Sequence, residues 1–70
     1  MKEDKQAICD EFLKALWKTR DGRDVVSLNY IKTDVEEIVA VTFSNGYTKT
    51  ANVACDSGIA MIHDIIRQVF

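Results

Sequence analysis

The spacing of apolar residues divides this chain into five segments, which predict the order helix, strand, strand, strand, helix. Apolar residues with helical spacing predict a first helix from about Glu3 or Asp4 to Arg20, with Gly22 as a left-handed C-cap. We expect the apolar stripe of this helix to face the core. It consists of Ile8, Cys9, Phe12, Leu13, Ala15 and Leu16.

Two runs of β-branched and apolar residues predict antiparallel strands at 25–31 and 38–43, joined by a short loop. If Lys32 lies opposite Glu37, six apolar side chains share one face of this pair, and we take that face to be the core side. These side chains are Val26, Leu28, Tyr30, Val39, Val41 and Phe43.

A turn at Asn45-Gly46 predicts a third strand, for which two registers are possible. A two-residue turn pairs Phe43 with Thr48 and buries three polar side chains. A three-residue loop with a left-handed Gly46 pairs Phe43 with Tyr47 instead. In that register the inward side chains are Tyr47, Ala51 and Val53. Because burying unpartnered polar side chains is costly, we predict the three-residue loop.

A second apolar stripe predicts a helix from Asp56 or Ser57 to the end of the sequence. The stripe is broader than one contact between a small helix and a sheet requires. We therefore expect part of it to pack against the first helix or against a second copy of the chain. Its members are Ile59, Ile62, Ile66, Val69 and Phe70, with Met61 and Ile65 alongside.

Together these segments predict a single α+β domain over residues 1–70. The predicted fold is α-β-β-β-α, a three-stranded antiparallel meander with both helices packed on one face. We expect the opposite face of the sheet to be solvated. That face carries Ser27, Asn29, Thr42, Thr48, Thr50 and Asn52, with Ile31 and Ile38 at one end.

The composition is that of a small globular domain. The chain has 70 residues, of which 47% are hydrophobic and 29% are charged, and it contains no proline. No apolar run approaches the roughly 20 residues that cross a bilayer, and the charged start does not resemble a signal peptide. Two cysteines are too few for a disulfide framework, so we expect a cytoplasmic protein with free thiols and no membrane partner.

The sequence offers little for catalysis or metal binding. Cys55 lies at the predicted start of the second helix, where a thiol can become a reactive nucleophile. His63 lies further along the same helix, and no carboxylate has the spacing that points to a catalytic triad. One histidine and two cysteines do not make a zinc site. We predict a non-enzyme without cofactor or small-molecule ligand, and a thiol enzyme that uses Cys55 is the remote alternative.

The order of elements resembles that of the double-stranded RNA-binding domain, over the whole chain but in order alone. That family carries a lysine-rich start to its second helix, which contacts phosphates. The matching residues here, 56–63, contain an aspartate and no lysine. With a net charge of −2, this departure argues against nucleic-acid binding. A nucleic-acid-binding accessory protein stays the alternative function, through the basic residues Lys14, Lys18, Arg20 and Arg23.

The leading hypothesis is a non-enzymatic protein-interaction module that forms a homodimer. A meander leaves two strand edges open, and the third strand carries few charges to block pairing. A strand edge or the apolar face of the second helix could bind a second copy or another protein. Trp17 lies at the margin of the first stripe, either as a partly buried core-edge residue or as an exposed anchor for a partner. The candidate interaction surface consists of Trp17, Ile31, Ile38, Thr48, Thr50, Met61 and Ile65.

Overall fold

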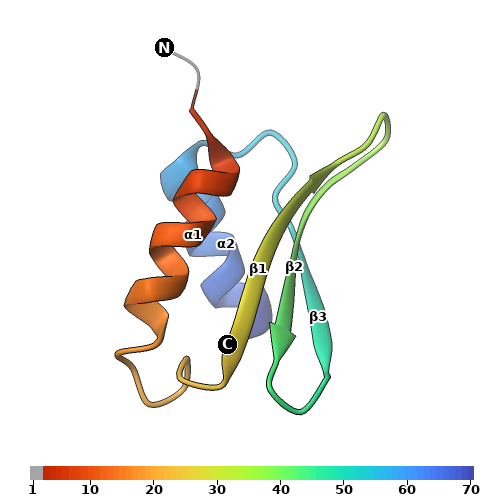
Figure 1. Cartoon of the computed structure of the whole chain (residues 1–70). Helices are drawn as coiled ribbons and strands as arrows, with labels where there is room; N and C mark the ends of the chain where they lie inside the picture. The colour runs from red at the N-terminus through yellow and green to blue at the C-terminus, as the bar shows by residue number, and fades with distance from the viewer. Residues whose placement is uncertain (1–2) are drawn as a thin grey trace.

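A computed structural model describes residues 3–70 and confirms the predicted order of elements. Both helices lie on the same face of an antiparallel sheet whose strand order is β1-β2-β3 (Figure 1). Helix α1 packs mainly on β1, and α2 packs mainly on β3. The elements are α1 (Lys5–Leu16), β1 (Val25–Lys32), β2 (Glu37–Phe43), β3 (Thr48–Asn52) and α2 (Gly58–Val69).

Helix α1 begins at an aspartate cap and ends earlier than predicted. The Asp4 side chain accepts a hydrogen bond from the backbone N–H of Ala7 at 3.0 Å, which satisfies a free donor of the first turn. The helix ends at Leu16 rather than at Arg20, because a tighter turn follows it. In that turn, Thr19 donates its hydroxyl to the backbone oxygen of Leu16 at 2.7 Å.

Gly22 is needed for close packing, and the predicted left-handed cap is wrong. Among the glycines of residues 3–70, Gly46 has a positive φ and Gly22 does not. A Cβ on Gly22 would lie 2.5 Å from the backbone oxygen of Leu16. The N–H of Gly22 also donates to the Thr19 hydroxyl at 2.9 Å. The glycine therefore lets the chain return under the end of α1 towards β1.

The first hairpin has the predicted register along most of its length. Lys32 lies opposite Glu37, as expected, and the pairing continues inward from there. At the start of β1, however, a bulge places Val25 opposite Phe43 in place of Val26. Val25 is buried, whereas Val26 is 54% exposed, so the prediction for Val26 is wrong. The bulge forms where the backbone of Asp24 and Val25 is already held by loop hydrogen bonds.

The second hairpin has the predicted three-residue loop. The N–H of Phe43 donates to the oxygen of Tyr47 at 2.8 Å, and Gly46 is left-handed with a φ of 87°. Ala51 and Val53 are fully buried, as this register requires. Tyr47 is 63% exposed, contrary to the prediction. Phe70 packs on Phe43, with ring centroids 6.3 Å apart, whereas Tyr47 lies opposite Phe43 just before the outer strand and borders an open pocket.

Helix α2 follows a Ser57 cap, as predicted, but faces the sheet with a different side. Met61 and Ile65 are fully buried and Val69 nearly so, whereas Ile59 and Ile66 are exposed. The predicted centre of the apolar stripe is therefore wrong. The core of the described residues contains no buried charged side chain, and Ala15 lies outside it. Its members are Cys9, Leu16, Val25, Leu28, Val39, Val41, Ala51, Val53, Met61, Ile65 and Val69.

Replacing Gly46 by alanine should destabilise the domain by about 1 kcal/mol, because an L-residue must then adopt a positive φ. A Cβ at this position would meet no atom within 4 Å, so the backbone conformation is the whole cost. Gly46→Asn should lose less, because asparagine tolerates this conformation better. Urea unfolding of the three proteins measures the difference, and an alanine variant as stable as the wild type would contradict it.

Candidate interaction surfaces

The outer side of the helical layer carries an apolar surface, which we call the helical face. Helices α1 and α2 lie side by side and run in the same direction (Figure 1). On α2, Ile59 is 83% exposed, and Ile66 and Phe70 are each nearly half exposed. Ile62 lines a shallow hollow between the helices, together with residues of α1. The helical face consists of Ile8, Phe12, Ile59, Ile62, Ile66 and Phe70.

The β1 edge of the sheet is partly closed by side chains of the α1 segment. The amide of Gln6 donates to the backbone oxygen of Leu28 at 3.0 Å and accepts from the N–H of Tyr30 at 2.8 Å. These are the two bonds that a neighbouring strand would make. Nearby, the indole N–H of Trp17 donates to the backbone oxygen of Val25 at 2.6 Å. The expected open strand edge is therefore partly covered at β1, while the backbone of Lys32 has no side-chain partner within residues 3–70.

The β3 edge is only partly closed. Gln68 of α2 accepts from the N–H of Asn52 at 2.8 Å and donates to its backbone oxygen at 3.0 Å. This arrangement repeats on β3 what Gln6 does on β1. No side chain of residues 3–70 makes a hydrogen bond to the backbone of Thr48 or Thr50. The open part of this edge is therefore the first half of β3.

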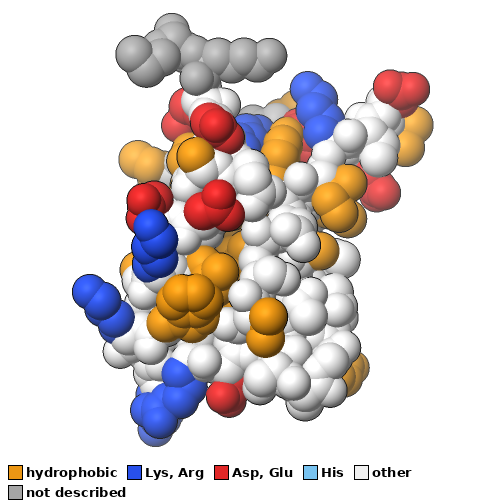
Figure 2. Space-filling model, viewed as in Figure 1, with side chains coloured by type: hydrophobic (Ala, Val, Ile, Leu, Met, Phe, Trp, Pro, Cys, Tyr) orange, Lys and Arg blue, Asp and Glu red, His pale blue; other side chains and the backbone are white. Residues whose placement is uncertain are grey.

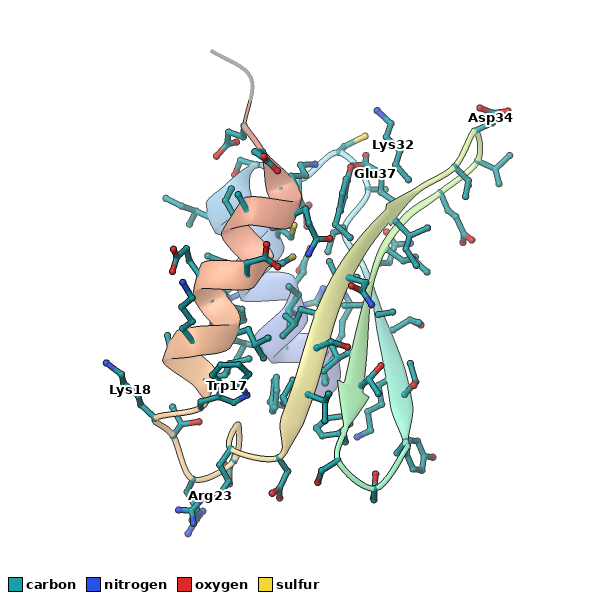
Figure 3. The ribbon with its side chains drawn as sticks, viewed as in Figure 1. Trp17, Lys18, Arg23, Lys32, Asp34 and Glu37 are labelled. Atoms are coloured by element: carbon teal, nitrogen blue, oxygen red, sulfur yellow. The ribbon has the colours of Figure 1, made fainter. Side chains whose placement is uncertain are left out.

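The residues predicted as one interaction surface lie in four different places. Trp17 is half exposed and lies between the end of α1 and the start of β1 (Figure 3). Ile31 and Ile38 are paired across β1 and β2. Thr48 and Thr50 are exposed residues of β3. Met61 and Ile65 belong to the core, so their assignment to a surface is wrong.

A charged cluster at one end of the sheet is the main polar feature that the sequence analysis missed. The Glu37 carboxylate accepts hydrogen bonds from the Tyr30 hydroxyl, from the Lys5 ammonium at 3.0 Å and from the N–H of Cys55 at 3.2 Å. Figure 3 shows Glu37 at this end, near Lys32. The Lys5 ammonium lies 5.5 Å from the centre of the Tyr30 ring. The four groups come from separate segments, and no local spacing signals their meeting.

These contacts shift the pKa values of the cluster in the direction that favours the ion pair. The bond from Tyr30, followed by those from Lys5 and Cys55, lowers the pKa of Glu37 to about 2. The hydrogen bond to Glu37 raises the pKa of Lys5 and that of Tyr30. Across the neutral range Glu37 and Lys5 are therefore charged and Tyr30 is neutral, so that one carboxylate accepts from all the donors of the cluster.

Two neighbouring acids lie on the α2 side of the molecule, Asp56 just before the helix and Asp64 within it. The interaction between the carboxyl groups of Asp56 and Asp64 raises the pKa of Asp56 and lowers that of Asp64. Arg67 lowers the pKa of Asp64 further through an ion pair at 3.0 Å. The shielded Oδ2 of Asp56 has no hydrogen-bond partner among residues 3–70.

The start of α2 is occupied by a carboxylate of the chain itself. Glu3 accepts a hydrogen bond from the N–H of Gly58 at 3.0 Å, in the position where a helix start would bind an anion. A Cβ on Gly58 would lie 2.5 Å from a Glu3 carboxylate oxygen and 2.7 Å from Ile8. The glycine therefore permits this close contact, and a phosphate would have to displace Glu3.

The basic residues of the first helix and the turn after it do not form a continuous field. Lys14 pairs with Glu11 and Arg20 pairs with Asp21, each at 3.3 Å. Lys18 and Arg23 have no ion pair within residues 3–70, and both point into solvent (Figure 3). Figure 2 shows basic side chains at one end of this side of the molecule, with acidic groups among them.

The cysteines and the histidine stay apart. Cys9 is fully buried, and burial raises the pKa of its thiol to about 11. Cys55 is exposed on a left-handed residue with a φ of 63°, and His63 is exposed on α2. The part of the chain that the structure describes contains no group of three or more residues that could hold a metal ion. A thiol activity of Cys55 stays a prediction.

Comparison with known proteins gives no relative. No protein-family model matches the chain, and neither a curated protein nor a solved structure matches it. Within residues 3–70, no helix is both long enough and apolar enough to span a membrane.

Replacing Glu37 by glutamine should lower the melting temperature at pH 7 and flatten its dependence on pH under acidic conditions. The stabilising effect of this carboxylate is present above its ordinary pKa of 4.5 and is lost as the pH falls towards its folded pKa of about 2. Melting curves across that window test the prediction. Glu36→Gln, which neutralises the exposed neighbour, is the matched control, and identical curves for both variants would contradict the role of the cluster.

Proposed function

We propose that this chain is a non-enzymatic protein-interaction domain that forms a homodimer through the helical face. The observation that carries the proposal is the exposed apolar row along α2. Ile59, Ile66 and Phe70 are large side chains that a monomer leaves in water, and the row continues into the hollow beside α1. An exposed apolar surface of this kind is typical of a contact site.

The row on α2 matches its own reversed copy. The row consists of four residues spaced three, four and four positions apart, which are Ile59, Ile62, Ile66 and Phe70. In an antiparallel pair about a two-fold axis, Ile59 would lie near Phe70 of the second copy, and Ile62 near Ile66 of the second copy. Such an isologous contact buries each exposed side chain against another apolar one. This self-complementarity supports a second copy as the occupant.

The strand edges support dimerisation less well. The middle of the β1 edge is covered by Gln6, and the last residue of β3 is held by Gln68. We therefore favour the helical face over the strand edges for self-association. The two free cysteines, Cys9 and Cys55, fit a reducing compartment such as the cytoplasm.

Replacing Ile59 by lysine should weaken the homodimer at least about tenfold, because a charge then enters the apolar contact. Sedimentation equilibrium over a range of protein concentrations measures the dissociation constant. Ile59 is 83% exposed, so the variant should stay folded, and circular dichroism checks this.

Val35→Lys is the matched control, because it makes the same kind of change at a residue that is 91% exposed in the loop between β1 and β2. We expect Val35→Lys to dimerise like the wild type. A wild-type protein that stays monomeric at high micromolar concentration, or equal weakening by both variants, would contradict the proposed face.

Nucleic-acid binding is the second candidate, and its support is that Lys18 and Arg23 are free to contact phosphates. We expect no saturable binding of duplex RNA, duplex DNA or single strands in a polarisation assay at low ionic strength. The reason is that Glu3 occupies the anion position at the start of α2. Binding that weakens steeply with added salt would instead favour this second candidate.

A further inference from the structure

The open half of the β3 edge presents backbone groups in the pattern that an added strand requires. The backbone groups of Tyr47 and Val53 make hydrogen bonds to β2. Because successive residues of a strand turn their N–H and C=O groups to opposite sides, those of Thr48, Thr50 and Asn52 point away from β2. Gln68 satisfies Asn52. Within the described chain, the two N–H donors and two C=O acceptors of Thr48 and Thr50 therefore have no partner, and a neighbouring strand could bind them.

We propose that this edge binds an extended segment of another protein, which adds to β3 as an antiparallel fourth strand and places an acidic residue opposite Lys49. An extended backbone is the one ligand that satisfies all four groups at their spacing. Lys49 lies between Thr48 and Thr50, is exposed, and has no ion pair in the structure of residues 3–70.

A second copy of the chain fits this edge poorly. The two-fold antiparallel register that uses all four groups pairs Thr48 with Thr50 of the second copy. It also places Lys49 directly opposite Lys49 of the second copy, in the pair type with the closest side chains. A register that pairs Thr50 with Thr50 of the second copy, or Thr48 with Thr48 of the second copy, makes half as many hydrogen bonds. The repulsion of the two lysines thus favours a partner with an acid at this position.

A hollow beside Lys49 indicates a second feature of the partner. An open pocket of about 500 Å³ lies on the helix side of the hairpin end, next to Phe43 and Tyr47. In the antiparallel register, the partner residue two positions after the acid lies opposite Tyr47 on the same side. Asp24 also lines this pocket, which disfavours a second acid there. The preferred partner segment therefore carries an acid, then any residue, then an apolar residue.

The test uses a fluorescein-labelled peptide, Ser-Thr-Val-Thr-Glu-Thr-Leu-Thr-Ser, titrated with the full chain and followed by fluorescence anisotropy. A peptide with lysine in place of the glutamate should bind at least about tenfold more weakly. Lys49→Glu should reverse this preference, because it reverses the charge that faces the peptide. Lys32→Glu, at an exposed position on β1, is the matched control and should leave the preference unchanged.

Backbone variants test whether the contact is a strand pairing. Thr50→Pro removes one outward N–H at a position where an edge strand tolerates proline, and it should abolish binding. Thr50→Val keeps that N–H and should bind like the wild type. Methylating the peptide nitrogen of either threonine beside the glutamate should also abolish binding. Methylating the nitrogen of the glutamate, which points away from β3, should not.

Removing the side chain that closes the end of β3 gives a gain-of-binding test. Gln68→Ala frees the backbone of Asn52, so the same peptide gains two further hydrogen bonds and should bind several-fold more tightly. The Ile59→Lys variant should bind the peptide like the wild type, because the helical face is a separate surface. A failure of dimerisation and a failure of peptide binding are therefore distinguishable.

Amide NMR shifts locate the contact. The proposal requires that the largest changes on peptide addition fall on Thr48, Lys49 and Thr50. Equal binding of the glutamate and lysine peptides, shifts confined to α1 and α2, or full binding by Thr50→Pro would each overturn it.

Discussion

The rotation of α2 about its own axis is the constraint on which the division between core and surface depends. Helix α2 has apolar residues around more than half of its circumference, so several rotations about its axis would bury an apolar stripe. In the observed rotation the Gln68 side chain also reaches the backbone of Asn52 through two hydrogen bonds. In that rotation Met61 and Ile65 enter the core, and Ile59 and Ile66 remain outside. The apolar helical face is a consequence of this choice.

The same chemical group covers part of each edge of the sheet. A primary amide has one donor and one acceptor side by side, so Gln6 and Gln68 can each replace a short length of neighbouring strand. The helices are thereby tied to the outer strands by hydrogen bonds as well as by apolar packing. Gln6 covers the middle of β1 and Gln68 covers the end of β3, while the hairpin end of β3 has no such side chain within residues 3–70. This arrangement leaves the backbone of Thr48 and Thr50 exposed, with the charged side chain of Lys49 between them.

Carboxylates of the chain also fill the positions that an anionic ligand would use. Glu3 takes the N–H of Gly58, and Glu37 takes the N–H of Cys55 just before α2. A double-stranded RNA-binding domain shares the order of elements with this chain, but here the start of the second helix is neutralised from within. The fold therefore carries no implication of phosphate binding, because that function depends on the groups placed at this helix start.

Local patterns in the sequence were sufficient for the order of elements, the α+β class and both hairpin registers. Alternation along a strand and the positive φ of Gly46 are properties of neighbouring residues, and they can be read without the rest of the molecule. The rotation of α2, the bulge that expels Val26, the exposure of Tyr47 and the cluster around Glu37 were decided by tertiary structure alone. Each depends on packing or contacts between residues far apart in the chain, such as Phe43 with Phe70 or Lys5 with Glu37. Periodicity indicates which residues can be buried together, but it does not indicate which of several apolar sides meets the sheet.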